Sequence, residues 1–232
     1  MPAATVSSVI TYAQQLAQTD SNGIGSVLGI AFYNDALQDM TRDLIERGID
    51  ASQTSEAYAT IAASDAQPGR FAWPSDMFAL KTIEVDFTNS GTSSYLQAQK
   101  LDVANLQGTT TWDYLRVNQS TSFPQFTNHG DTGEIFPTPV AGSPALVRIY
   151  YYLTPTEATV VSDSTAYPQT LDYRMLSAKM TSLYYKRQQN PDMAKVFEDD
   201  YQMRLGKVKN ILAPQSKQPI QPEKLHITGW SF

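Results

Sequence analysis

The sequence predicts an α+β protein, in which a four-helix domain built from both ends of the chain carries an inserted antiparallel β-sheet or barrel region and an extended C-terminal arm. Apolar residues recur at helical spacing toward both ends, whereas the middle is rich in Thr, Tyr, Phe and Pro and is interrupted by turn signals. The last residues contain several prolines and no helical period. We therefore expect the halves of the helical domain at 1–50 and 167–213, a β-rich insertion at 54–155 and an arm at 214–232.

Two helices are predicted in the first half of the helical domain, over residues 4–19 and from Ser26 to Gly48. The turn-forming stretch DSNGIGS separates them, and Gly48 is a typical C-terminal stop. Each segment has one apolar face, which is made of Val6, Val9, Ile10, Ala13, Leu16 and Ala17 in the first and of Tyr33, Leu37, Met40 and Leu44 in the second. Both faces have to pack against another element.

The middle of the chain is predicted to form roughly five to seven short antiparallel strands, because alternating or β-branched runs such as FALKTIEVDF and ALVRIYYYL lie between turn signals. Pro137 and Pro139 lack backbone donors and so end one strand. On the next strand the side chains alternate between two faces, Leu146, Arg148, Tyr150 and Tyr152 on one and Val147, Ile149, Tyr151 and Leu153 on the other. We expect the second, apolar face to lie in the core.

A helical hairpin is predicted after Pro168, because two segments with apolar stripes are joined by a short turn. At the start of its second helix, Asn190 can cap, Pro191 suits the first helical position and Asp192 meets the positive end of the helix dipole. The stripes are Leu171, Met175, Leu176, Met180, Leu183 and Tyr184, and then Met193, Phe197, Tyr201, Leu205, Val208 and Leu212.

The arm after Ala213 carries four large apolar side chains, Leu225, Ile227, Trp230 and Phe232. Apolar anchors on an extended segment are typical of docking on a partner by strand addition or by filling a pocket. The alternative is an arm laid back on its own domain.

The charge and composition of the chain exclude several classes of function. The formal net charge is −6, with 7 basic and 17 acidic side chains in residues 1–170 and 10 basic and 6 acidic ones in residues 171–232. An acidic chain is poorly suited to gripping nucleic acid through its phosphates. The absence of cysteine excludes disulfides and thiolate metal sites. No window approaches the ~18 apolar residues of a membrane span and no secretion signal is found, so we expect a soluble protein without membrane contact.

No catalytic, metal-binding or cofactor-binding motif is present, and the chain has only two histidines, His129 and His226. We therefore expect neither an enzyme nor a bound cofactor or metal. Two alternatives stay open. In a hydrolase, His129 beside Asp131 would act as general base for a Ser or Thr nucleophile. In a carbohydrate-binding module, the aromatic residues of the β-rich region would stack on sugars, namely Trp73, Trp112 and Tyr150–Tyr152.

Five stretches across about 200 residues share their order and spacing with a known family. They are TVSSVI, YNDALQDMTRDLIERG, GRFAWPSDMFALKTIEV, SFPQFTNHGDTGEIFPTPVAGSPALVRIYYYLTP and YPQTLDYRMLSAKMTSLYYKRQQNPDMAKVFEDDYQMRL. The second holds an Asn-Asp-Ala core, the third a Gly-aromatic-Pro-x-Asp segment that leads into a strand, and the fourth a Pro-Thr-Pro turn before a Tyr-Tyr strand. In these features the chain resembles the head-to-tail adaptor proteins of tailed bacteriophages, which are also called connector or head-completion proteins.

This resemblance implies a structural, non-enzymatic protein that is synthesised in the host bacterial cytoplasm and becomes part of the virion at the head-to-tail junction. It implies a homo-oligomeric ring, usually a dodecamer, under the portal protein. Such a ring carries the downstream tail, nozzle or stopper protein and extends the channel through which double-stranded DNA passes without sequence-specific binding. The arm residues Leu225, Ile227, Trp230 and Phe232 are then expected to contact the portal or a neighbour, and Arg148, Tyr150 and Tyr152 another subunit or the tail protein.

Overall fold

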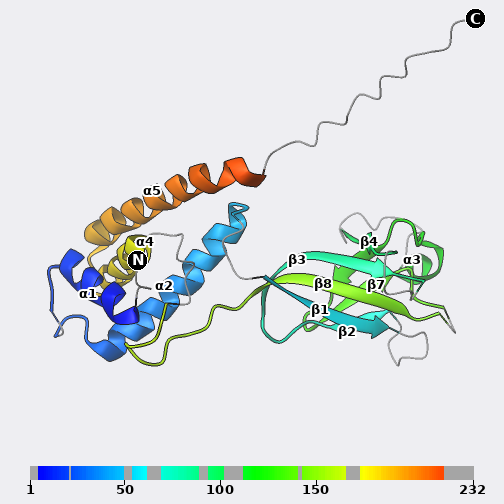
Figure 1. Ribbon diagram of the computed structural model, residues 1–232, viewed down its shortest axis with the longest axis horizontal. Helices are drawn as coiled ribbons and strands as arrows, with labels where there is room; N and C mark the ends of the chain where they lie inside the picture. Colours follow the sequence, from blue (N-terminus) through cyan, green and yellow to red (C-terminus); the bar gives the residue numbers. More distant parts are fainter. Residues whose placement is uncertain are drawn as a thin grey trace, which may run out of the picture. The chain divides into compact units, whose positions relative to one another are not determined.

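The chain forms two structural units in a computed structural model, one made of Met1–Ala51 and Glu157–Phe232 and the other of Ser52–Thr156 (Figure 1). The structure describes residues 5–20, 22–49, 54–61, 69–88, 94–101, 112–140, 143–165 and 173–216, with side chains up to residue 208. Within these residues the protein is α+β, as predicted, with five helices and eight strands.

The first unit contains four of the helices, and each coincides with a predicted segment to within a few residues: α1 (Val6–Leu16), α2 (Ser26–Glu46), α4 (Tyr173–Arg187) and α5 (Pro191–Ser216). Thr5 and Ser8 form a capping box at the start of α1, in which each side chain accepts a hydrogen bond from the other residue's backbone N–H. Gly48, at a φ of +68°, follows the end of α2 as predicted.

The start of α5 has the predicted cap, because the backbone N–H of Met193 donates to the side-chain oxygen of Asn190 at 3.2 Å. Pro191 is the first helical residue. The helix extends to Ser216, three residues beyond the predicted end at Ala213.

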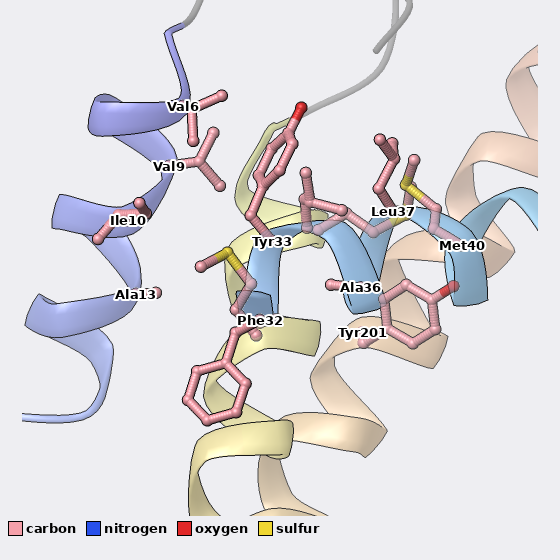
Figure 2. Close-up of a cluster of buried hydrophobic side chains, with 14 of the residues drawn as sticks. Val6, Val9, Ile10, Ala13, Phe32, Tyr33, Ala36, Leu37, Met40 and Tyr201 are labelled. Carbon is pink, nitrogen blue, oxygen red and sulfur yellow. The ribbon is translucent and has the colours of Figure 1, made fainter. Parts of the chain in front are cut away.

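One cluster of buried side chains draws on α1, α2, α4 and α5. Figure 2 shows Val9 and Ala13 of α1 on the side of that helix that faces α2. Gly29 lets α1 and α2 approach closely, because a Cβ atom there would lie 2.9 Å from Ile10 Cδ1. Tyr201 of α5 is fully buried in the same cluster. The apolar faces predicted for α1 and α2 are therefore in the core.

The prediction of a single apolar stripe on α4 was incomplete. Eight consecutive residues are buried, from Met175 to Ser182, because α4 packs against α1, α2 and α5. Its polar side chains have partners inside the unit. Ser177 Oγ donates to the carbonyl of Val9 at 3.0 Å, and Ser182 Oγ donates to the carbonyl of Ala194 at 3.0 Å. Hydroxyls that bond to neighbouring backbone allow polar residues in a helix that is buried on all sides.

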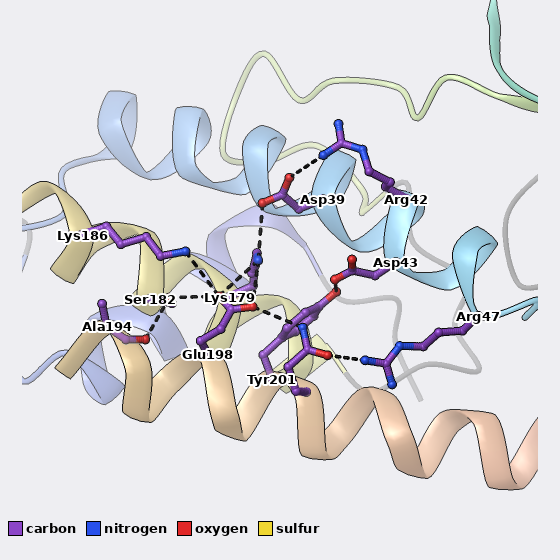
Figure 3. A network of polar contacts seen from close by, with 11 residues as sticks. Asp39, Arg42, Asp43, Arg47, Lys179, Ser182, Lys186, Ala194, Glu198 and Tyr201 are labelled. Carbon is purple, nitrogen blue, oxygen red and sulfur yellow. Dashed lines mark hydrogen bonds and ion pairs between the residues drawn. The ribbon is translucent and has the colours of Figure 1, made fainter. Parts of the chain in front are cut away.

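A charged network joins α2, α4 and α5 around the buried side chain of Lys179 (Figure 3). Lys179 Nζ lies 3.0 Å from Glu198 Oε1 and 3.4 Å from Asp39 Oδ2. Glu198 also accepts hydrogen bonds from Ser182 Oγ and Gln202 Nε2. Burial by itself would raise the pKa of Glu198, but the hydrogen bonds from Lys179 and Gln202 and the charges of Lys179 and Lys186 outweigh it, so the pKa lies below its usual value.

Replacing Glu198 by glutamine is expected to lower the free energy of unfolding by about 1 kcal/mol at neutral pH, because the pair is partly screened by solvent. A carboxyl group whose pKa is lower in the folded than in the unfolded state stabilises the fold at pH values above its ordinary pKa, which for glutamate is near 4.5. That contribution is lost as the pH falls through the folded-state value. Urea unfolding of both proteins between pH 7 and pH 3 should show the difference shrinking. A difference that grows toward acid pH would contradict this, and Glu157→Gln, at an exposed carboxylate, is the control.

The second unit contains two four-stranded sheets. The first has the order β1 (Thr54–Ile61), β8 (Ala145–Leu153), β3 (Met77–Asp86) and β4 (Leu96–Gln97). The second has the order β2 (Arg70–Ala72), β7 (Thr132–Phe136), β6 (Gln125–Asn128) and β5 (Gln99–Lys100). β7 ends at Phe136, directly before Pro137, as predicted. The inner faces of both sheets supply one core cluster, which includes Ile83, Phe126, Ile135, Val147 and Ile149.

The structure corrects three expectations for this unit. The barrel alternative was wrong, since the described strands form two sheets and no closed barrel. The number of strands exceeds the predicted range because β4 and β5 are two-residue strands, too short to leave a sequence pattern, and β5 pairs with β6 in parallel. A short helix, α3 (Trp112–Asn118), was not predicted. Its seven residues are about two turns, which is too few for a clear helical period.

Candidate interaction surface

The two faces of β8 are buried to different degrees, as predicted from the alternation of its residues. Burial alternates along the strand, so that Val147, Ile149 and Tyr151 lie in the core, while Arg148 and Tyr150 are only half-buried. β8 is also an inner strand of its sheet, with β1 and β3 on either side. The half-buried face of β8 therefore lies within a surface that β1 and β3 continue on both sides.

This surface carries four tyrosines and one arginine, which we call the tyrosine face: Tyr58, Tyr95, Arg148, Tyr150 and Tyr152. Tyr58 of β1 lies opposite Arg148 in the strand register. The Arg148 guanidinium carbon lies 4.2 Å from the ring centroid of Tyr95 and 5.1 Å from that of Tyr150. Lys81 Nζ lies 5.6 Å from the ring centroid of Tyr152. These distances are within the range of cation–π contacts.

Glu84 of β3 fixes the arginine at the centre of the tyrosine face. Arg148 donates to Glu84 Oε2 from Nε at 2.9 Å and also from Nη2. The hydrogen bonds with Glu84 raise the pKa of Arg148 most, and a hydrogen bond with Tyr58 adds to this effect. Burial alone would lower that pKa. Burial is the larger cause that raises the pKa of Tyr150, and the nearby negative charge of Glu84 is the second. The surface therefore presents phenol groups, one of them 61% exposed at Tyr58, around an ion pair between Arg148 and Glu84.

Such a surface suits protein recognition better than catalysis. Tyrosine and arginine are enriched at protein–protein interfaces because they bury a large area and keep a polar group for the partner. The predicted contact residues Arg148, Tyr150 and Tyr152 lie together here. Sequence reasoning missed Tyr58, Tyr95 and Glu84. The alternation of the stretch TSEAYATI would have placed Tyr58 on a strand surface, but only the strand order places it beside β8.

His129 lies beside the fully buried carboxylate of Glu134, which Arg70 and Arg116 also contact. Arg116 Nε donates to Glu134 Oε1 at 2.7 Å. Glu134 Oε2 lies 2.8 Å from His129 Nε2 and 3.5 Å from Arg70 Nε, without a directed hydrogen bond. The partner of His129 is thus a carboxylate on β7. Glutamate within the apolar stretch GEIF is the sequence signal that could have indicated a buried ion cluster.

A groove of about 880 Å³ lies next to this cluster, beside α3 and the segment after β7. Its apolar lining includes Phe87, Val117, Pro137, Pro139 and Val140. The two charged residues among the described residues that line it are Arg70 and Arg116. The groove therefore combines apolar surface with positive charge.

The aromatic residues of the carbohydrate alternative do not lie together. Trp73 packs edge-on against Phe71, with ring centroids 4.9 Å apart, and donates its Nε1–H to Asn128 at 3.3 Å. Trp112 stacks on Phe136 of β7. Both are next to the second sheet, whereas Tyr150–Tyr152 belong to the first, and Tyr151 faces the core.

The predicted arm residues Leu225, Ile227, Trp230 and Phe232 lie outside the described residues, so their contacts stay a prediction. In the part of the chain that the structure describes, no group of three or more His, Asp or Glu side chains is arranged to hold a metal ion. Among the helices described, none is both long and apolar enough to cross a membrane.

Comparison with known proteins adds one finding. A family model described as SU10 adaptor protein matches residues 4–222, a range that includes the five helices and eight strands found in the described residues. A search of curated proteins gives no match.

Proposed function

The chain belongs to the SU10 adaptor protein family, a family of phage head-to-tail adaptors, and from this premise we propose that it forms a ring under the portal, joining the DNA-filled head to the tail. The observation that carries the proposal is the extent of the match, residues 4–222, which takes in nearly the whole chain. The ring is a homo-oligomer of twelve copies, its role is structural rather than enzymatic, and its place is the head-to-tail junction of the virion.

The tyrosine face supports this proposal as a contact between neighbouring subunits or with the tail protein. Its one charged residue, Arg148, is already paired with Glu84. Covering the face therefore removes water mainly from aromatic and aliphatic surface, which favours association. The low charged fraction of the chain, 17%, fits a protein with much of its surface in contact with other subunits.

The ring also extends the DNA channel, through which double-stranded DNA moves without sequence-specific binding. A formal net charge of −6 supports this part of the proposal. Each phosphate contact with a cation strengthens binding, and a channel rich in such contacts would hold the DNA in place. An acidic protein avoids this.

Negative-stain electron microscopy tests the proposed ring. Purified protein is mixed with capsids, or with isolated portal rings, of the phage that encodes it, and we expect an additional ring of density at one vertex or on one end of the portal. Capsids from which the portal is absent serve as the control and should remain bare. Binding spread over the capsid surface, or no density at the portal vertex at saturating protein, would refute the proposal.

The C-terminal arm is proposed to bind the portal or a neighbouring subunit through Leu225, Ile227, Trp230 and Phe232. Truncation after Ser216 keeps α5 intact and removes these anchors. We expect the truncated protein to keep its helical circular dichroism and to lose at least ten-fold in portal affinity, measured by sedimentation with portal rings. Full affinity of the truncated protein would contradict the role of the arm but not the ring.

A further inference from the structure

We propose that the groove beside α3 binds an extended apolar segment with acidic side chains that belongs to the downstream tail protein. The inference rests on the proposed function for the identity of the partner. The groove itself is a feature of the second unit, with residues from the start of β2, α3 and the segment that follows β7.

The groove is lined by exposed apolar side chains, which indicates a docking surface. Val117 is 78% exposed and Val140 is 69% exposed, and both line the groove. Tyr114 on α3 and Phe123 in the loop after it are also more than half exposed. Large apolar side chains concentrated on one short segment of a surface mark protein-interaction sites more often than chance exposure does.

The charge of the groove selects an acidic partner. Arg70 and Arg116 line it, and no carboxylate is found among the described lining residues. Arg116 contacts the buried Glu134 through Nε, which lies 2.7 Å from Glu134 Oε1. The terminal nitrogen atoms of the guanidinium are therefore left for other partners. Its Nη1 contacts Asp113, at 2.8 Å, and the side chain of Asp113 is 89% exposed. An exposed ion pair contributes little, so an incoming carboxylate can replace Asp113.

Polar groups in the groove suit an extended backbone. Gln119, Thr121, Thr138 and Ser143 line it together with the apolar residues. The hydroxyl of Thr138 has no hydrogen-bond partner within the described residues. A peptide segment brings carbonyl and N–H groups at regular spacing, and its side chains alternate between the groove and solvent. A segment of this kind satisfies the polar groups and covers the apolar residues at the same time.

Fluorescence anisotropy with the full-length protein tests the proposal. The probes are three synthetic ten-residue peptides with the same apolar residues and with Glu, Gln or Lys at the remaining positions. We expect the Glu peptide to bind at least ten-fold more tightly than the Lys peptide, with an affinity that falls as salt is added. Equal affinity for all three peptides, or a single-stranded DNA oligomer that binds more tightly than the Glu peptide, would overturn the proposal.

Substitutions then assign the binding to the groove. Val117→Asp and Val140→Asp are expected to weaken binding of the Glu peptide at least ten-fold, while Val27→Asp, at a similarly exposed valine of the first unit, leaves binding unchanged. Asp113→Asn is expected to strengthen binding about three-fold, because it removes the carboxylate that competes for Arg116. Misfolding cannot produce such a gain. Wild-type affinity of the Val117→Asp and Val140→Asp proteins for the Glu peptide would refute the site. Weaker binding of that peptide by the Asp113→Asn protein would refute it as well.

The fate of assembled particles separates this inference from the proposed function. Heads that contain the Val117→Asp protein should still carry a ring at the portal vertex but should fail to acquire tails. A ring with normal tail attachment contradicts the groove proposal alone. Wild-type protein that forms no ring contradicts the proposed function, whatever the peptide measurements give.

Discussion

Replacing Tyr152 or Tyr150 by glutamate is expected to abolish incorporation of the protein into heads while leaving its own fold intact. Both side chains lie on the tyrosine face, outside the core to which Val147, Ile149 and Tyr151 contribute. Moving a carboxylate from water into an interface costs several kcal/mol of desolvation, by order of magnitude, and one nearby cation recovers only part of it. In a ring this cost recurs at every subunit contact, so the effect on assembly far exceeds the effect on one chain.

The fold should tolerate these changes because the substituted side chains remain solvated in the isolated chain. Tyr152 is the better position for this comparison, because Lys81 lies next to it and can pair with the new carboxylate in the isolated chain. At position 150 the new charge lies opposite Glu56 on β1, although Arg148 is close. We expect the free energy of unfolding to change by less than about 1 kcal/mol in both proteins.

The measurement compares assembly with stability for the same proteins. Each variant is supplied from a plasmid to a phage that lacks its own copy of the gene, the particles are counted by negative-stain microscopy, and melting of the purified chain is followed by circular dichroism. Tyr150→Phe and Tyr152→Phe, which keep the rings, are the matched controls and should assemble normally. Glutamate variants that assemble normally but melt at a clearly lower temperature would show that the face is part of the fold and not an interface.

Replacing Tyr201 by alanine is expected to be the most destabilising single change in the first unit, with a loss of about 3–5 kcal/mol in the free energy of unfolding. The side chain is fully buried in the cluster that α1, α2, α4 and α5 share. Its hydroxyl donates to Asp43 Oδ2 of α2 at 2.7 Å, and Lys179 Nζ lies 5.0 Å from its ring centroid. Burial and then the hydrogen bond to Asp43 raise the pKa of Tyr201, so the group stays protonated.

Tyr201→Phe separates the two contributions, because it keeps the ring and removes the hydroxyl. We expect it to cost about 1 kcal/mol, the usual net value of a hydrogen bond. Urea unfolding should be followed by circular dichroism at a helical wavelength, since the strands belong to the other unit. Equal losses for the alanine and phenylalanine variants would mean that the hydrogen bond to Asp43, not the packing of the ring, holds α5 in place.

Local patterns predicted the elements whose signal lies within a few residues. The Asn190–Pro191 start of α5 and Gly48 after α2 follow from the backbone needs of helix ends, which the nearest residues satisfy. The two faces of β8 follow from the period of an extended chain. Prediction failed where an element is too short to show a period, as for α3, β4 and β5.

The sequence by itself therefore determined the α+β class, the end of α2, the start of α5 and the side of β8 that faces the core, because each depends on the conformation of neighbouring residues. Only the tertiary structure decided which distant side chains meet. It surrounds α4 on all sides, so that Lys179 and Ser177 are buried with partners from other helices. It also sets β1 beside β8 and closes Arg70 and Arg116 around Glu134. Such contacts depend on the packing of elements far apart in the chain, which no local period records.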